Sequence, residues 1–365
     1  MAQNDGPSIF EKKYATMSLV LVLFMLITLI IVVYNHSQQH GIQEVLQLDT
    51  HSDKRNRILS TAATQMPDNG VVNILETAEG IKIRTIQWHP VAVPKGTVLL
   101  LQGYSEFIEK YDEVIQHLLD RQLAVLSFDW RGQGLSSRLI KDPQKGHITS
   151  FADFIKDADL VHQQLLIKMP TPHFLMGHSM GGHVAFRILQ EYPNRFQKAI
   201  LCAPFLGWSP NFGAGKLPSS LTILIASFMK LLGYGQSYTY GATPPYPDKT
   251  LSGQTSDRIR FQKRVEFYKI EPYILMGGPT WDWILESTKS LQIILQKERI
   301  DTIQTPILLA SGAKDGMVSP QAHHEVAAKC DQITLHDFPE AMHEILMETD
   351  NIQEEFWHVF DEFVD

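Results

Sequence analysis

The chain has 365 residues, of which 44% are hydrophobic and 20% charged, a composition that excludes a largely disordered protein. Its 32 lysines and arginines face 40 aspartates and glutamates, and the formal net charge of -8 excludes the basic surface that a nucleic-acid partner requires. Two cysteines, Cys202 and Cys330, are too few for a disulfide framework or a cysteine-rich zinc site.

An apolar segment near the amino terminus is the first predicted element. Residues 17–34 contain no charged side chain, and as a helix they would cross most of a hydrocarbon core about 30 Å thick. A buried core helix would usually keep a polar stripe, which this segment lacks. A cleaved signal peptide would have a shorter apolar region and a small-residue cleavage site, which residues 34–38 do not provide. We therefore predict one uncleaved membrane helix after a short tail, residues 1–16.

The flanking charges predict how this helix is oriented. Lys12 and Lys13 precede it, and the next basic residue is Lys54, so the amino terminus is expected in the cytoplasm and the remaining chain outside it. If Lys54 and the arginines after it are counted as well, the charge difference between the two flanks disappears. The side of the membrane on which the domain lies therefore stays undecided. Residues 35–65 are polar and lack periodicity, and we interpret them as a linker.

Residues 66–365 alternate between short apolar runs and amphipathic stretches. Strands are predicted at 71–76, 81–88, 97–101, 124–128, 174–177, 199–202, 307–310 and 333–335. Helices are predicted at 107–120, 150–168, 180–191, 319–329 and 351–363. The first two strands form a hairpin, and the others need crossover connections. The series predicts an α/β fold with a mostly parallel sheet, helices on both faces, and active groups at the carboxyl ends of its strands.

Residues from about 205 to 300 interrupt this alternation. They contain an apolar stretch at 221–232, a loop rich in tyrosine and proline at 238–247, and a further predicted helix. An insertion of this kind after a core strand fits a cap over an active site. The alternative is that 221–232 is an ordinary core helix.

The pentapeptide Gly177-His178-Ser179-Met180-Gly181 lies directly after a predicted strand and directly before a predicted helix. A serine is a weak nucleophile unless it is exposed beside a base. A tight turn between strand and helix exposes it, and the two glycines permit that turn because they carry no Cβ. We therefore predict that Ser179 is a nucleophile. The alternative is a serine that caps the helix.

A general base and an acid that orients it are expected on the carboxyl side of Ser179, because the chain order in this architecture is Ser, acid, His. Asp315 follows the predicted strand at 307–310, and His343 follows the last predicted strand. His343 would accept the Ser179 proton, and Asp315 would hold and stabilise the imidazole. The alternatives are His178, His323 and His324 for the base, and Asp129, Asp331 and Asp337 for the acid.

A tetrahedral intermediate also needs backbone donors for its oxyanion. One donor usually comes from the residue after the nucleophile, which is Met180, and the other from the loop after an early strand. The loop Leu101–Glu106 follows the first core strand, so we predict the amide of Tyr104 as the second donor. The alternative is a plain turn at Gly103.

The motifs for a metal or a cofactor are incomplete. Gly132-Gln133-Gly134 lacks the third glycine of a dinucleotide site, and His343-Glu344 lacks the second histidine of a metalloprotease helix. We therefore predict catalysis without metal or organic cofactor.

These motifs resemble those of the α/β-hydrolase superfamily, in particular its monoacylglycerol-lipase-like branch with the bacterial inner-membrane lysophospholipases. The resemblance covers roughly residues 70 to 365. It is carried by QGYSE at 102–106, DWRGQGLS at 129–136, GHSMGG at 177–182 and AMHEIL at 341–346. Within the insertion, TSDRIRF at 255–261 and GGPTWDW at 277–283 are similar to the lysophospholipases specifically.

The resemblance implies an α/β-hydrolase domain over 66–365 and a triad of Ser179, Asp315 and His343. It implies cleavage of the carboxylic ester of a lysophospholipid, or next of a monoacylglycerol, at the inner membrane. The family does not generally require a membrane helix, which here would hold the domain beside its lipid substrate. The family's oxyanion loop usually begins His-Gly, and Gln102 in place of that histidine leaves the loop's anchoring open.

Three alternatives to this function remain. The same fold includes general esterases and aminopeptidases, although an apolar cap argues against free peptides. A membrane-tethered binding protein without turnover is the non-enzymatic alternative. Head group, acyl-chain length and oligomeric state cannot be predicted from the sequence.

Overall fold

The computed structural model describes residues 55–245, except 63, 65, 211 and 212, and residues 254–365, together with the isolated positions 25, 28 and 29. The chain divides into two units, Met1–Asp49 and Thr50–Asp365, and the elements below belong to the second.

The membrane helix predicted for residues 17–34 lies outside the described residues, apart from Met25, Thr28 and Leu29, which are helical. Within the part of the chain that the structure describes, no helix combines the length and the apolar character needed to cross a bilayer.

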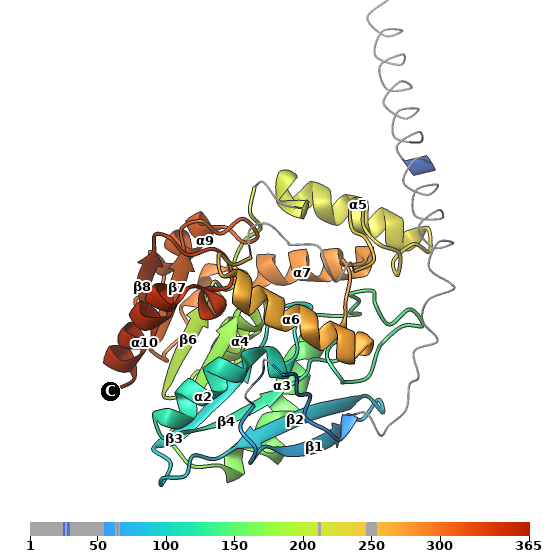
Figure 1. Ribbon diagram of the computed structural model, residues 1–365. Coiled ribbons are helices and arrows are strands. Elements are labelled where there is room, and N and C mark those ends of the chain that lie inside the picture. Colours follow the sequence, from blue (N-terminus) through green and yellow to red (C-terminus); the bar gives the residue numbers. More distant parts are fainter. Residues whose placement is uncertain are drawn as a thin grey trace, which may run out of the picture. The chain divides into compact units, whose positions relative to one another are not determined.

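A sheet forms the centre of the second unit (Figure 1). Its strands are β1 (Val71–Glu76), β2 (Lys82–Trp88), β3 (Gly96–Leu101), β4 (Leu123–Phe128), β5 (His173–His178), β6 (Lys198–Cys202), β7 (Ile307–Gly312) and β8 (Ile333–Phe338). They lie in the order β1-β2-β4-β3-β5-β6-β7-β8. The β1–β2 and β2–β4 pairs are antiparallel, and the other pairs are parallel. The predicted mostly parallel sheet with an antiparallel hairpin at its edge is confirmed.

The strand sequences account for this order. Nearly every side chain of β3 and β4 is apolar, and every residue of both strands is buried. Strands that are covered on both faces need such continuous apolar runs. The two edge strands, β1 and β8, are partly exposed along their length, and their sequences mix polar with apolar residues.

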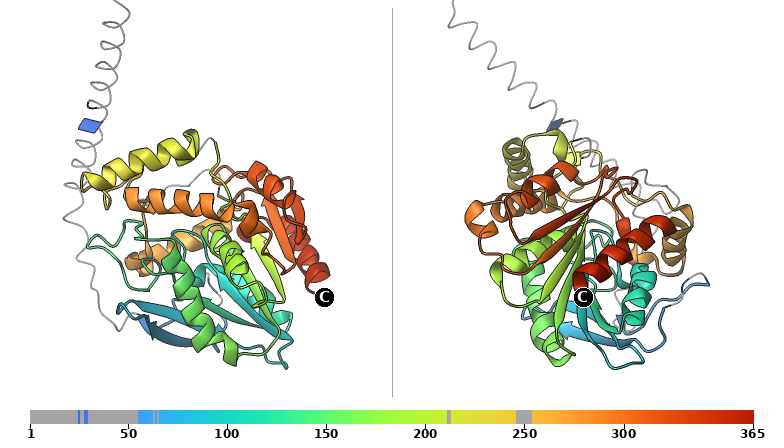
Figure 2. Two further views of the ribbon diagram at one scale, coloured as in Figure 1. Left: turned by 180° about the vertical axis from the view of Figure 1, so that it is seen from behind. Right: turned by 90° about the vertical axis from the view of Figure 1, so that its left-hand side faces the viewer.

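Helices cover both faces of the sheet. Figure 2 shows α3 (Ala152–Gln164) and α4 (Met180–Glu191) on one face, and α2 (Asp112–Asp120) and α10 (Asp350–Val364) on the other. The helix α9 (Pro320–Ala327) packs against β7 and β8. Three 3-10 turns complete this part: η2 (Ile108–Tyr111), η3 (Leu166–Lys168) and η6 (Ile345–Met347).

Residues 203–306, between β6 and β7, are called the insertion here. Its described elements are η4 (Gly213–Lys216), α5 (Ser219–Leu231), α6 (Arg258–Ile270), η5 (Pro272–Ile274), α7 (Trp281–Ile294) and α8 (Lys297–Ile300). As far as the chain is described, the insertion adds no strand to the sheet. The helix α5 packs along α7 (Figure 1).

The apolar stretch 221–232 is not an ordinary core helix. In α5 only Thr222, Ala226 and Met229 are buried. Leucines on the other side of the helix are exposed, and Leu224 keeps 66% of its surface accessible. One face of α5 therefore packs on the protein, and a face that carries several leucines is left outside.

Candidate active site

Ser179 lies at the turn between β5 and α4. Its φ of 52° and ψ of -116° are a left-handed conformation that residues with a Cβ rarely adopt. The turn is possible because its glycines leave room for the backbone. A Cβ on Gly181 would lie 2.3 Å from the carbonyl oxygen of Leu101, and a Cβ on Gly177 would lie 2.7 Å from that of Gly181. At the tip of this turn Ser179 remains partly exposed.

The structure brings the three predicted triad side chains together. Ser179 Oγ lies 2.9 Å from His343 Nε2, and His343 Nδ1 lies 2.7 Å from Asp315 Oδ2. The three residues follow β5, β7 and β8, which run parallel, so their carboxyl ends meet at one edge of the sheet. This arrangement can pass the serine proton to the imidazole while the carboxylate holds the ring.

Asp315 is oriented by the turn after β7. Its Oδ1 accepts hydrogen bonds from the backbone N–H groups of Met317 at 2.7 Å and Val318 at 3.0 Å. Burial would raise the pKa of Asp315, but the charge and hydrogen bond of His343 outweigh burial and hold this pKa below its usual value. The carboxylate is therefore ionised at neutral pH and can stabilise an imidazolium.

The pH dependence of hydrolysis should follow His343. Burial would lower the pKa of His343, but the Asp315 carboxylate outweighs burial and raises this pKa above its ordinary value. Protonated His343 cannot accept the serine proton, so kcat/KM should rise with pH through an inflection above about 6.5. Initial rates on a soluble ester between about pH 5 and 9 measure this inflection. Because His343 and Asp315 are buried, added salt should shift the pH of this inflection only slightly. An inflection below 6.5 would contradict the assignment.

Two backbone N–H groups belong to the segments on which oxyanion donors were predicted, the start of α4 and the loop after β3. The N–H of Met180 opens α4, where the helix dipole favours negative charge. In the loop after β3, the N–H groups of Gly103 and Ser105, on either side of Tyr104, donate to protein side chains. Among the described residues, no hydrogen-bond acceptor is present for the N–H of Tyr104 or of Met180. These are the two amides predicted as oxyanion donors.

Comparison with known proteins assigns the family. The family described as "Serine aminopeptidase, S33" matches residues 92–350. The chain belongs to this family. "Probable lysophospholipase L2" of Haemophilus influenzae is 29% identical over 275 residues, which cover 72% of this chain and 82% of the relative. "Lysophospholipase L2" of Escherichia coli K12 is 28% identical over 290 residues, which cover 73% and 79%.

A solved structure shows the fold of this S33-family hydrolase. A soluble variant of monoglyceride lipase from Saccharomyces cerevisiae matches with a TM-score of 0.63 at 19% identity, and the match covers 81% of this chain and 96% of that one. The chain has the α/β-hydrolase fold, as its resemblance to that superfamily implied. It is a serine ester hydrolase, similar to the lysophospholipases and monoglyceride lipases.

The loop at Gln102 is well anchored in this hydrolase. Gln102 Nε2 donates to Ser127 Oγ at 2.7 Å, and its backbone carbonyl accepts from Trp130 Nε1 at 2.9 Å. The glutamine side chain therefore holds the loop to β4, and the backbone of the same residue holds it to the segment after β4. This answers how the loop is attached without the family's usual histidine.

Glu106 is a residue of the site that sequence reasoning missed. Its carboxylate accepts from the N–H of Gly103, pairs with Lys110, and lies 3.3 Å from His178 Nδ1. His178 Nε2 lies 3.2 Å from the carbonyl oxygen of His343. Burial would raise the pKa of Glu106, but Lys110 and His178 hold it well below its usual value. One buried carboxylate thus connects the oxyanion loop, the turn at the nucleophile and the loop of the base.

The other candidate histidines have different partners. His178 supports the site through Glu106, as described above. His323 is buried with Nδ1 at 2.9 Å from Ser311 Oγ and Nε2 at 2.8 Å from the carbonyl oxygen of Pro204, and burial lowers its pKa to about 4. His324 pairs with Asp337 at the surface. Within the described part of the chain, no three metal-ligating side chains are grouped closely enough to hold an ion.

The alternative acid Asp129 serves the fold. Its carboxylate lies 2.8 Å from Arg84 Nη1 and accepts from the backbone N–H groups of Ile108 and Leu135. Arg84 is fully buried and also pairs with Glu109. The three charges join β2, η2 and the segment after β4.

Replacing Arg84 with methionine should lower the free energy of unfolding by about 3–5 kcal/mol, because it leaves two buried carboxylates without their cation. Urea unfolding followed by tryptophan fluorescence measures the loss. Arg121→Met, at a partly exposed pair with Asp361, is the matched control and should change stability by less than about 1 kcal/mol. Equal losses in the two variants would contradict the expectation.

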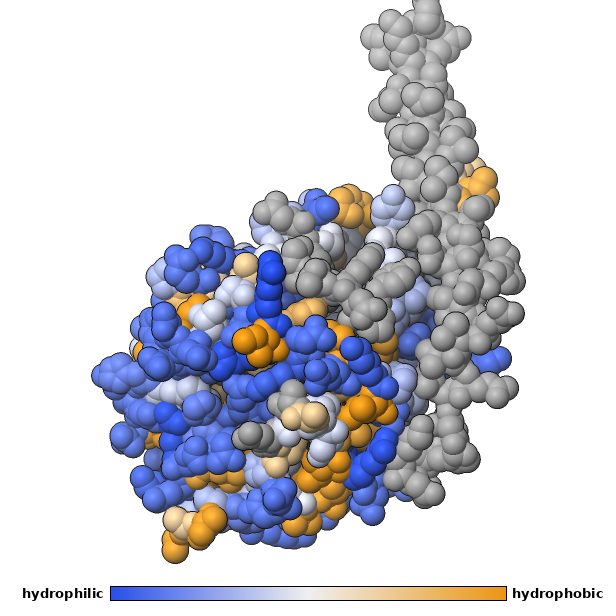
Figure 3. Space-filling model, viewed as in Figure 1, coloured by the Kyte–Doolittle hydropathy of each residue, from blue (hydrophilic) through white to orange (hydrophobic). Residues whose placement is uncertain are grey.

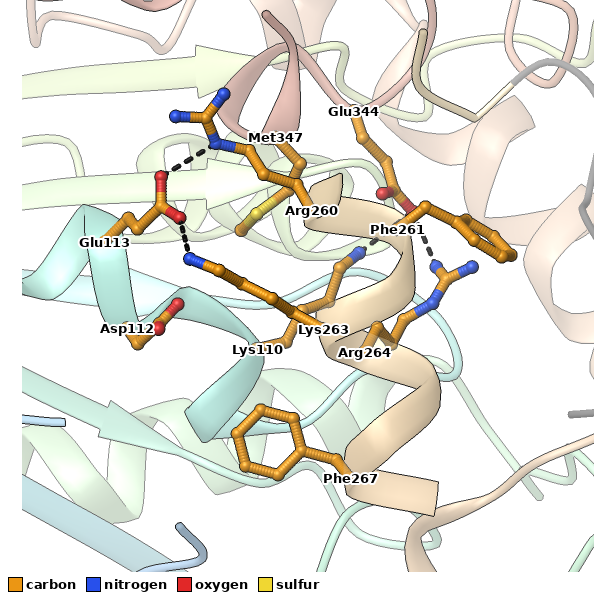
Figure 4. A pocket seen from close by; sticks show the side chains of 10 residues that line it. All are labelled: Lys110, Asp112, Glu113, Arg260, Phe261, Lys263, Arg264, Phe267, Glu344 and Met347. Atoms are coloured by element: carbon orange, nitrogen blue, oxygen red, sulfur yellow. Dashed lines mark hydrogen bonds and ion pairs between the residues drawn. The ribbon is translucent and has the colours of Figure 1, made fainter. Parts of the chain in front are cut away.

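A pocket beside the site is lined by charges that already have partners (Figure 4). On α6, Arg260 and Lys263 pair with Glu113 of α2. Arg264 of α6 and Lys110 both pair with Glu344, the residue after His343. Arg260 also pairs with Asp257 and Asp350, and Lys110 with Glu106, so each of the four cations has a carboxylate partner. The pocket is therefore better understood as the contact that fastens α6 to the rest of the domain than as an anion site.

Proposed function

We propose that this hydrolase cleaves the carboxylic ester of a lysophospholipid, with Ser179 as nucleophile, His343 as general base and acid, and Asp315 as the orienting acid. The observation that carries the proposal is the chain of contacts at 2.9 Å and 2.7 Å that joins a partly exposed serine to a buried carboxylate. The names of the relatives in Haemophilus influenzae and Escherichia coli support the substrate class.

In this mechanism the oxygen of Ser179 attacks the ester carbonyl while its proton moves to His343 Nε2. The N–H groups of Tyr104 and Met180 donate to the oxyanion of the tetrahedral intermediate. Its collapse breaks the ester bond, and His343 returns the proton to the leaving glycerol oxygen. Water then attacks the acyl-enzyme with His343 as base, which releases the fatty acid and restores Ser179.

The outer face of α5 supports a substrate held in a membrane. Leu221, Leu224 and Leu231 recur along this face at helical spacing, and all three are exposed. In Figure 3 the surface where Figure 1 draws α5 includes apolar residues beside polar ones. Residues 205–247 contain no aspartate or glutamate, in a chain of net charge -8. We propose that this face rests on the bilayer and that residues 17–34 anchor the chain there.

Adding charge to this face should weaken contact with lipid. We expect Leu224→Glu with Leu231→Glu, in the unit Thr50–Asp365, to reduce hydrolysis of lysophospholipid held in vesicles by about tenfold or more, since each buried leucine contributes about 1.5–3 kcal/mol. Rates on a soluble ester should stay unchanged. Val91→Glu, at a fully exposed valine on the loop after β2, is the matched control. Equal vesicle activity in all three proteins would contradict membrane contact through α5.

The substrate class is tested by fatty-acid release from lysophospholipid, monoacylglycerol and diacyl phospholipid that carry the same acyl chain, with Ser179→Ala in parallel. We expect the lysophospholipid to give the highest kcat/KM. A preference for monoacylglycerol would change the proposed substrate class and leave the proposed mechanism in place. Cleavage of a soluble ester alone would remove the lipid assignment.

A further inference from the structure

The segment Met276–Thr280 of the insertion, which overlaps the GGPTWDW stretch, lies against the candidate oxyanion loop. The loop before α3 holds this segment through its backbone. The N–H of Gly277 donates to the carbonyl of Gln144 at 2.8 Å, and the N–H of Thr280 donates to the carbonyl of Gly146 at 2.8 Å. The insertion is therefore fixed to the domain at this point by backbone hydrogen bonds.

The side chain of Tyr104 reaches this segment. Its hydroxyl donates to the carbonyl of Gly277 at 3.0 Å, and its ring packs on Trp283 with centroids 4.8 Å apart. Gly146 makes room for it, since a Cβ there would lie 1.7 Å from the Tyr104 hydroxyl. The residue whose amide is the candidate oxyanion donor is thus bound to the insertion through its side chain.

Ser105 makes a second contact of the same kind. Its hydroxyl donates to the carbonyl of Met276 at 3.2 Å, and its N–H donates to Gln133 Oε1 at 2.6 Å. Its φ of 62° is a left-handed conformation that needs support from its surroundings when the residue is not glycine. Two consecutive side chains of the loop therefore bind two consecutive carbonyls of the insertion.

We propose that Tyr104 and Ser105 are positioning residues, and that their hydroxyls bind the insertion so that its place on the domain sets the orientation of the Tyr104 amide. The inference rests on the proposed function, because it assumes an oxyanion formed on Ser179. The peptide that carries this amide joins Gly103, whose own N–H is held by Glu106, to Tyr104, whose hydroxyl binds the insertion. Its direction is therefore decided by contacts to the domain on one side and to the insertion on the other.

This role predicts losses in turnover rather than in substrate binding. The oxyanion exists only after attack on the carbonyl, so a misplaced donor lowers kcat and leaves KM nearly unchanged. We expect Tyr104→Phe and Ser105→Ala each to lower kcat by about tenfold. The double variant should stay within the about 100- to 1000-fold loss that follows complete removal of one oxyanion donor.

Two inhibitors separate positioning from binding. An alkyl trifluoromethyl ketone adds to the serine hydroxyl to give a tetrahedral oxyanion, so its Ki should rise by the same factor by which kcat falls. An ether analogue of the lysophospholipid has no carbonyl to be attacked, and its Ki should stay at the wild-type value. Tyr273→Phe is the matched control, because the ring of this tyrosine of the insertion packs against Arg138.

Thermal unfolding of each variant shows that the fold is intact. Wild-type kcat and wild-type ketone affinity in both Tyr104→Phe and Ser105→Ala would overturn the inference. Equal weakening of the ether analogue would also overturn it, since the hydroxyls would then act in binding. These failures leave the proposed function untouched as long as Ser179→Ala is inactive. Activity retained by Ser179→Ala would instead remove the proposed function.

Discussion

Replacing Ser179 with alanine should lower kcat for ester hydrolysis by about a million-fold, because no acyl-enzyme can form without the serine oxygen. The fold should be unchanged. Alanine keeps the Cβ that serine already carries at a φ of 52°, and the change removes only an oxygen that faces His343 Nε2 at 2.9 Å. The remaining rate would come from the oxyanion donors and from substrate binding.

The measurement is the initial rate of fatty-acid or chromophore release from one ester substrate. Labelling by a fluorophosphonate is measured in parallel. The wild-type chain should be labelled on Ser179, and Ser179→Ala should not be labelled. Ser60→Ala, at an exposed serine before β1, should keep wild-type rates and labelling. Activity or labelling that persists in Ser179→Ala would show that another residue is the nucleophile.

Replacing Asp315 with asparagine should lower kcat by about 10⁴-fold while leaving KM nearly unchanged. The backbone N–H groups of Met317 and Val318 already occupy one side of the carboxylate, so the amide oxygen of asparagine should stay there. The amide nitrogen then faces His343 Nδ1 as a donor. The imidazole must carry its proton on Nε2, where it donates to Ser179 and cannot accept the serine proton.

Two other aspartates make the test specific. Asp337→Asn, at an exposed acid that pairs with His324, should keep full activity. Asp129→Asn should reduce stability through Arg84 more than it reduces the kcat of the folded enzyme. Rates are compared with the folded fraction measured by circular dichroism. A normal kcat in Asp315→Asn, or a 10⁴-fold loss in folded Asp129→Asn, would assign the acid differently.

Much of the fold was predictable because its signals are local. The run from Thr97 to Leu101 and the pentapeptide at 177–181 lie within a few residues of the strand and turn boundaries that the structure has. Continuous apolar runs identify strands buried on both faces, and parallel strands bring the ends of β5, β7 and β8 to one edge. Chain order then selected Asp315 and His343 from many acids and histidines, and the structure places both beside Ser179.

The support around these residues was not predictable from spacing. Glu106 lies 72 residues before His178, and Tyr104 lies 173 residues before Gly277, so no periodic pattern joins either pair. Nor could the apolar stretch at 221–232 show which of its faces is covered, because both faces are apolar and only packing against α7 distinguishes them.

Local patterns along the chain were enough to predict the strands, a mostly parallel sheet and the residue types able to carry acyl transfer. Each of these depends on neighbours in the chain, through side-chain period, glycine at a tight turn and position after a strand. How the oxyanion loop is held became visible only in the folded chain: Gln102 binds Ser127, the buried Glu106 binds Gly103, and Tyr104 binds the insertion. Those hydrogen bonds join groups far apart in the chain, and they exist only once the sheet and the insertion are packed together.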